Sequence, residues 1–228
     1  MTQRLGTNYG GWVLPREVLL NENSVVYSGG VGEDISFDIK LSAKYNCHIF
    51  LIDPTQKAWV HYNEAIEYFS DKSKKFSGNI QTDYYAQIEQ ETPNFHKFSY
   101  HKLGLWDEKT DLKFFRQTND NYVSQSLIEN MFGDRYDMVP VDTLRNIMTL
   151  NGHTHIDLLK VDIEGAEIHV INNMLDNGIY PKYLLVEFDL FLKKKDVDKT
   201  TQRLMQRLQK EKYVVLKNEN WNITFVKT

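Results

Sequence analysis

Short apolar runs alternate along the chain with longer stretches in which apolar residues recur every three or four positions. The short runs predict buried strands, and the longer stretches predict helices that cover them. The predicted strands are residues 25–28, 47–52, 95–106, 112–115, 156–162 and 183–188. The predicted helices are residues 33–45, 61–70, 141–150, 166–175 and 196–210. This alternation is typical of an α/β domain with a mostly parallel sheet.

The C-terminal pattern differs, because residues 213–217 and 223–226 flank a polar turn and predict an antiparallel hairpin. Residues 116–140 are expected to form a long loop over one end of the sheet. No linker composition interrupts the chain, so we expect one domain over 1–228, with 1–22 as a lead-in or lid and 23–228 as the core. The predicted fold is a doubly wound, mostly parallel sheet of seven strands with a terminal antiparallel hairpin.

Composition excludes several classes of protein. The only cysteine is Cys47, which rules out an internal disulfide and a thiolate metal cage. A formal charge of −4 argues against a large nucleic-acid footprint. No run approaches the roughly 18 apolar residues of a membrane span, and the first residues lack the pattern of a signal peptide. We therefore expect a cytoplasmic protein without a membrane span.

A glycine-rich turn, SGGVG at 28–32, follows the strand predicted at 25–28. Glycines there allow close backbone approach to a ligand, although such a turn also serves as a plain tight connection. Asp53 ends the next strand about 20 residues later, where a carboxylate accepts hydrogen bonds from ribose hydroxyls. NAD and S-adenosylmethionine both contain ribose, and the absence of G-x-G-x-x-G disfavours NAD. The residues expected to contact the ligand here are Ser28, Gly29, Gly30, Gly32, Asp34 and Asp53.

Charged residues mark the end of the strand predicted at 156–162. Side chains alternate along a strand, so Lys160 and Asp162 share one face of it. Buried charges are costly unless paired, so the two form either a structural ion pair or part of a site. Glu187 ends the following strand and is expected to face the same cleft, and Glu164 adds a further carboxylate.

Several segments, in this order, resemble the FkbM-type methyltransferases over roughly residues 7–228: VVYSGGVGEDISFD, LIDPT, LGLWDEKTDLKFF, VPVDTL, IDLLKVDIEGAE and LLVEFD. The terminal hairpin is likewise similar to class I methyltransferases. The resemblance implies a Rossmann-like class I fold, S-adenosylmethionine as cofactor and an oxygen acceptor, often a sugar hydroxyl. Many such enzymes have an acidic residue at the position of Val26 and glycine at that of Ser28. Glu33, Asp34 and Asp162 are therefore candidates for holding the methionine ammonium group.

The resemblance also implies roles for individual residues. Asp162 would contact the methionyl end or act as base, while Lys160 and Glu187 shape the acceptor side. Adenine would lie near the end of the strand predicted at 95–106, where a tryptophan either stacks on it or packs in the core. The residues expected there are Gly104, Leu105 and Trp106. The residues expected to contact a carbohydrate acceptor are Tyr122, Ser124, Ser126 and Glu164. Near the N-terminus, a lid or a cap on the sheet edge is expected from Tyr9, Gly11 and Trp12.

No metal site is favoured, although Asp162, Glu164 and Glu187 have oxygen ligands suited to Mg²⁺ or Mn²⁺. His153 and His155 precede their strand and are expected on the surface at the opposite end from the cleft. The leading hypothesis is an S-adenosylmethionine-dependent O-methyltransferase acting on a carbohydrate hydroxyl, alone or in a longer chain with glycosyltransferase domains. The alternatives are a non-catalytic nucleotide- or glycan-binding module and an NAD-dependent oxidoreductase.

Overall fold

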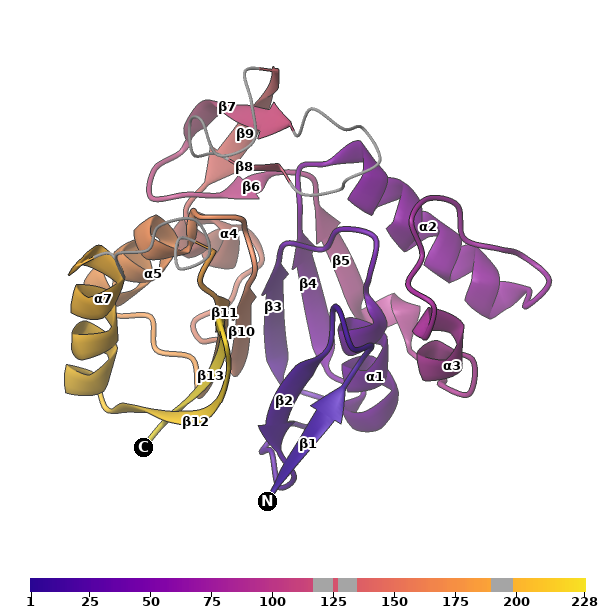
Figure 1. Ribbon diagram of the computed structural model, residues 1–228, viewed down its shortest axis with the longest axis horizontal. Coiled ribbons are helices and arrows are strands. Elements are labelled where there is room, and N and C mark those ends of the chain that lie inside the picture. Colours follow the sequence, from indigo (N-terminus) through magenta and orange to yellow (C-terminus); the bar gives the residue numbers. More distant parts are fainter. Residues whose placement is uncertain (117–124, 127–134, 190–198) are drawn as a thin grey trace.

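A seven-stranded sheet forms the centre of the computed structural model, which describes residues 1–116, 125–126, 135–189 and 199–228. The strand order is β12-β13-β11-β10-β3-β4-β5 (Figure 1). The strands are β3 (Val25–Gly29), β4 (His48–Ile52), β5 (Phe98–His101), β10 (Leu158–Val161), β11 (Tyr183–Glu187), β12 (Tyr213–Glu219) and β13 (Asn222–Lys227). Five strands are parallel, and β13 is antiparallel to both of its neighbours. The predicted mostly parallel sheet with a terminal antiparallel hairpin is confirmed.

Helices cover both faces of this sheet. One face packs against α1 (Ser36–Tyr45), α2 (Gln56–Ser70) and α3 (Tyr84–Ile88), and the other against α4 (Leu144–Leu150), α5 (Glu167–Asp176) and α7 (Lys199–Lys210). Alternation along β10 divides its side chains between the two cores, because Leu158 lies in the first and Leu159 in the second. Cys47 is fully buried in the first core. Among the described residues, no helix is both long and apolar enough to cross a membrane.

A second, four-stranded sheet replaces part of the predicted loop at 116–140. Its order is β6-β9-β7-β8, with β6 (Gly104–Leu105), β7 (Thr110–Arg116), β8 (Gln125–Ser126) and β9 (Tyr136–Asp142). The predicted strand 95–106 is therefore divided between a short helix η1 (Phe95–Lys97), β5 in the main sheet and β6 here. Figure 1 shows this sheet above the carboxyl ends of β3 and β4.

The loop prediction was wrong for 136–140, and the helix prediction was wrong for 141–142. In β9 the buried Val139 and Val141 alternate with the exposed Met138 and Pro140, as in a half-buried strand. The polar and proline residues hid this alternation. Pairing with β7 and β6 then holds the segment in the sheet.

The N-terminal residues form a separate antiparallel hairpin of β1 (Thr2–Leu5) and β2 (Trp12–Pro15). Trp12 is buried in the first core. The hydroxyl of Thr224 in β13 donates to the carbonyl of Val13 at 2.7 Å, which ties the hairpin to the main sheet. The connection between β1 and β2 is consequently held near the carboxyl edge of the sheet, where the cavity described below opens.

Candidate functional site

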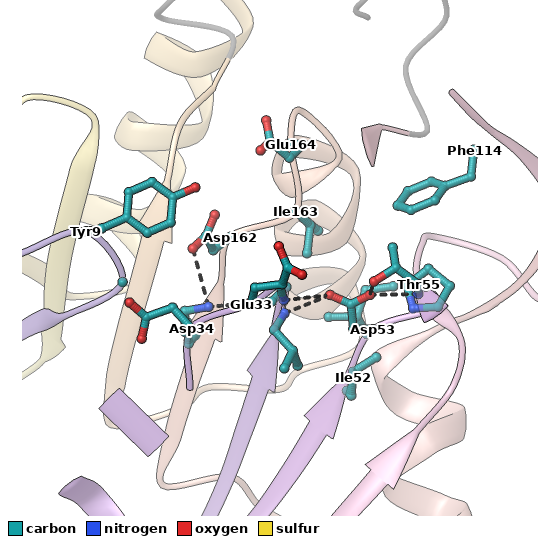
Figure 2. Close-up of a pocket in the computed structure, with 18 of the residues that line it drawn as sticks. Tyr9, Glu33, Asp34, Ile52, Asp53, Thr55, Phe114, Asp162, Ile163 and Glu164 are labelled. Atoms are coloured by element: carbon teal, nitrogen blue, oxygen red, sulfur yellow. Dashed lines mark hydrogen bonds and ion pairs between the residues drawn. The ribbon is translucent and has the colours of Figure 1, made fainter. Parts of the chain in front are cut away.

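A cavity of about 270 Å³ opens at the carboxyl ends of β3, β4 and β10. Its wall is built from six parts of the chain: the β1–β2 connection, the turn after β3, the end of β4, the α2–α3 connection, the second sheet and the turn after β10. Figure 2 shows the labelled side chains of Tyr9, Glu33, Asp53, Asp162 and Glu164 around it. In open α/β sheets this edge is where ligands bind.

The turn after β3 is fastened to the end of β4 by Asp53. Its Oδ2 accepts hydrogen bonds from the backbone N–H groups of Val31 at 2.9 Å and Gly32 at 3.1 Å. Its Oδ1 accepts from the backbone N–H of Thr55 at 2.8 Å and from the Thr55 hydroxyl at 2.7 Å. Gly30 has φ +79°, and an added Cβ would lie 1.5 Å from the carbonyl oxygen of Asp162, so only glycine fits. The turn is thus clamped between β4 and β10.

A second carboxylate, that of the buried Asp34, holds the N-terminal segment against the cavity. The Thr7 hydroxyl donates to its Oδ2 at 2.5 Å, and the backbone N–H of Ser36 donates to its Oδ1 at 2.9 Å. Thr7 also accepts from the N–H of Gly10, where an added Cβ would lie 2.7 Å from the Asp34 carboxyl carbon. This packing places Gly10 and the neighbouring Tyr9 in the cavity wall.

Lys160 supports the floor of the site. It is only 4% exposed; its ammonium donates to the carbonyl of Gly30 and lies 3.3 Å from Oδ2 of Asp162. Burial by itself lowers the pKa of Lys160, but the carboxylates of Asp162 and Asp38 outweigh it, so the pKa is raised and the side chain stays charged. Burial raises the pKa of Asp38 to about 6, against the opposing effect of Lys160. Lys160 therefore fixes the positions of Asp162 and the glycine turn.

Glu187 and Asp162 form a close pair of carboxyl groups. Burial, followed by the charge of Asp162 and a side-chain hydrogen bond with it, raises the pKa of Glu187 to about 10. Glu187 therefore carries a proton at neutral pH. Tyr9 leaves 65% of its surface exposed, but partial burial of its hydroxyl and the charges of Asp162 and Glu164 raise its pKa, so it remains a hydrogen-bond donor.

The opposite part of the wall is apolar. Ile52, Leu105 and Phe114 line it, together with Gly104, whose lack of a side chain leaves room beside them. Trp106 does not line the cavity; its ring stacks on His169, with the ring centroids 4.4 Å apart and the planes at 23°. An aromatic or purine ring entering here would meet aliphatic groups and Phe114 rather than the tryptophan.

Sequence reasoning identified about half of the cavity wall. The predicted residues that line it are Tyr9, Gly30, Gly32, Glu33, Asp34, Asp53, Gly104, Leu105, Lys160, Asp162 and Glu164. Those that do not line it are Gly11, Trp12, Ser28, Gly29, Trp106 and Glu187. Ser28 and Gly29 lie within β3, Ser28 fully buried. Tyr122 and Ser124 lie outside the described residues, and Ser126 is described only through the backbone of β8.

Sequence reasoning missed the cavity residues Gly10, Val31, Ile52, Pro54, Thr55, Asn79, Gln81, Phe114 and Ile163. Thr55 is the N-cap of α2 and accepts from the N–H of Ala58, a helix-start signal that the sequence carried. Phe114 lies in a predicted strand, but the direction in which its side chain points depends on the second sheet. Asn79 and Gln81 lie between α2 and α3 in a polar stretch without a periodic pattern.

Metal-ligating side chains do not converge in the described part of the chain: no group of three or more His, Cys, Asp or Glu is placed to hold an ion. His155 is exposed, as expected. His153 is not a free surface residue, because its Nδ1 is 2.8 Å from the Tyr27 hydroxyl and its ring packs edge-on against Phe50. This histidine belongs to the packing of the sheet face.

Comparison with known proteins adds one finding. A family model described as Methyltransferase FkbM domain matches residues 45–215. The matched range contains Asp53, Lys160, Asp162 and Glu187 but begins after the glycine turn and the N-terminal hairpin. No curated protein matches the chain closely enough to count as a relative.

Proposed function

Because the chain belongs to the FkbM methyltransferase domain family, we propose that it transfers a methyl group from S-adenosylmethionine to a hydroxyl group of a carbohydrate. The proposal includes a doubly wound, Rossmann-like class I fold. One observation carries it: the glycine turn and the carboxylate of Asp162 line the same cavity at the carboxyl edge of the sheet.

The chemistry of the cavity wall fits the donor. Ile52, Leu105 and Phe114 offer an apolar surface for the adenine ring, while Glu164 offers negative charge for the ammonium group. The Tyr9 hydroxyl, kept protonated by its raised pKa, is suited to donate to a carboxylate. A ligand with an apolar ring at one end and a cationic amino acid at the other matches this division of the wall.

The bound donor supplies an electrophilic methyl group, so the protein has to orient the acceptor hydroxyl and remove its proton. We propose Asp162 as the acceptor of that proton, since Lys160 holds its carboxylate in place and Glu187 already carries a proton at neutral pH. In this proposal Lys160 is a positioning residue. Glu187 keeps the neighbouring charge fixed by its hydrogen bond to Asp162.

The carbohydrate acceptor is proposed from the family resemblance and from the polar groups at the cavity wall. Asn79 and Gln81 present amide groups that donate to and accept from sugar hydroxyls. Tyr122, Ser124 and Ser126 stay predicted acceptor contacts.

Calorimetry with S-adenosylmethionine, S-adenosylhomocysteine and NAD tests the donor. We expect both sulfur ligands to bind and NAD not to bind; binding of NAD alone would contradict the proposal. Mass spectrometry of a glycan panel incubated with isotope-labelled donor then tests the acceptor, and a methylated hydroxyl is the expected product. Donor binding without transfer to any acceptor would favour a binding module.

A further inference from the structure

Lys160 carries a positive charge in an almost fully buried part of the sheet. Its neighbours in the register of the strands are Ser28 in β3 and Leu185 in β11, and neither side chain carries a charge. The ammonium lies 3.3 Å from Oδ2 of Asp162, whose carboxylate Figure 2 shows at the cavity wall. A buried charge that loses its partner is strongly destabilising. Lys160 therefore depends on the carboxylates that surround it.

The proposed reaction removes the charge of one of these carboxylates. As the acceptor oxygen bonds to the methyl carbon, its proton passes to Asp162, and the electron pair of the broken sulfur–carbon bond stays on sulfur. Asp162 is then neutral, while the buried Lys160 still carries its charge. Without a second carboxylate, the ammonium group would be left unpaired at that moment. A second counterion for Lys160 would therefore make Asp162 easier to protonate.

Asp38, in the first turn of α1, faces Lys160 from the side of the sheet that α1 covers. Its side chain is buried, and burial raises its pKa to about 6, against the opposing charge of Lys160. The carboxylate is therefore ionised at neutral pH. The other titratable groups that interact with Asp38 are Asp34 in the turn after β3, Cys47 before β4 and Tyr84 in α3, and none of them is a cation. Among the described residues, Lys160 is thus the counterion of Asp38.

We propose that Asp38 is a positioning residue for methyl transfer, whose carboxylate keeps Lys160 paired while Asp162 holds the proton of the acceptor. Asp38 does not line the cavity, so it acts through Lys160 rather than on a ligand. This inference rests on the proposed function, because it assumes that Asp162 accepts the proton. Loss of the Asp38 charge should therefore slow the transfer step and leave donor binding almost unchanged.

The test measures kcat in wild type and Asp38→Asn at two pH values, with labelled donor and the acceptor found in the glycan panel. At pH 8 the variant should be about 30-fold slower, because Lys160 is left unpaired when Asp162 is protonated. At pH 5 Asp38 is mostly protonated in the wild type as well, so the difference should shrink to about fourfold. Calorimetry at pH 8 should give affinities for S-adenosylhomocysteine that agree within about threefold, since the ligand does not touch Asp38.

Ser42→Ala is the matched control, because Ser42 lies one turn further along α1, is equally buried and accepts from the backbone N–H of Asn94 at 2.9 Å. It should lower the melting temperature without changing kcat at either pH. An unchanged kcat in Asp38→Asn, or the same fractional loss at pH 8 and pH 5, would overturn the inference alone. Absence of methyl transfer by the wild type would remove the proposed function, and this inference with it.

A second measurement needs neither donor nor acceptor. In the wild-type background Asp38→Asn should lower the melting temperature at pH 8, because Lys160 loses a counterion. In a Lys160→Met background the same substitution should raise it, because the Asp38 carboxylate is then buried without its cation. An equal decrease in both backgrounds would show that Asp38 and Lys160 are not paired, and would overturn the inference.

Discussion

Asp53 follows β4 and Asp162 follows β10, so the two aspartates lie on either side of β3 at the same edge of the sheet. Asp53 receives four hydrogen bonds from neutral donors of its own chain. Asp162 faces an ammonium group and a protonated carboxyl group. The two aspartates therefore have different surroundings, although both follow parallel strands. The Asp53 carboxylate holds backbone groups in place, whereas the Asp162 carboxylate interacts with ionisable groups, and a bound substrate can change those interactions.

The region around Asp53 and the region around Asp162 meet at Gly30, so substitution of Gly30 should have the largest effect. In Gly30→Ala the new Cβ would lie 1.5 Å from the Asp162 carbonyl oxygen at a φ of +79°. We expect a loss of about 3 kcal/mol in the free energy of unfolding and loss of ligand binding. Urea denaturation and calorimetry measure both.

Gly152→Ala is the matched control, because Gly152 also has positive φ, +72°, but has nothing within 4 Å of an added Cβ. Gly152→Ala should lower the free energy of unfolding by only about 1 kcal/mol, because the left-handed conformation is then the only source of strain. If both variants lost the same stability, close packing of the turn against β10 would not be the cause.

Asp162→Asn should show that Asp162, unlike Asp53, takes part in the reaction. We expect turnover to fall about 100-fold or more, as for the loss of a general base. Initial rates with labelled donor at saturating concentrations are the measurement. Asp176→Asn, on the exposed end of α5, should leave turnover unchanged, since its ion pair with Arg207 lies at the surface. Unchanged turnover in Asp162→Asn would remove the proposed base.

Glu187→Gln should test the charged region around Asp162 through the pH dependence of stability. The pKa of Glu187 is raised from 4.5 to about 10 in the folded chain, so between these values the unfolded chain has released a proton that the folded chain keeps. Stability should therefore fall as pH rises through this window, by at most about 1.4 kcal/mol per pH unit. Glutamine removes this dependence and should raise the melting temperature relative to wild type more at pH 9 than at pH 6.

Near pH 7 the same variant should change turnover only a few fold, because an amide resembles the protonated carboxyl group that it replaces. A large loss of turnover, with no change in the pH dependence of stability, would show that Glu187 is ionised and acts directly.

Tyr9→Phe should have the smallest effect. The hydroxyl lies among carboxylates at the cavity wall, but the side chain is 65% exposed and supports little of the core. We expect about a threefold loss of affinity for S-adenosylhomocysteine, in line with one solvent-accessible hydrogen bond. The melting temperature should not change, and a shift of several degrees would indicate a structural role instead.

The sequence predicted the sheet well where burial alone decides the pattern. The run at 156–162 became β10, and the apolar run at 183–188 became β11, because strands covered on both faces contain few polar residues. The segment at 136–142 was misjudged because β9 is half exposed and contains Pro140. The hairpin of β1 and β2 was missed because its strands are only four residues long.

The site was predictable in position but less so in detail. Strand ends placed Asp53 and Asp162 at one edge, and the glycines marked the turn. Hydrogen bonding to Asp53 depends on the three-dimensional path of that turn, which no local pattern specifies. Trp106 stacks on His169 of α5, a residue 63 positions away in the chain, so its distance from the cavity followed from tertiary packing.

The segment that carries Tyr9 has a consequence for how such a chain diversifies. It closes one side of the cavity, lies ahead of the matched region 45–215, and is held by the carboxylates of Asp34 and Asp83. Exchanging the residues between β1 and β2 would therefore change the cavity wall at Tyr9 and Gly10 while leaving the glycine turn and both strand-end aspartates in place.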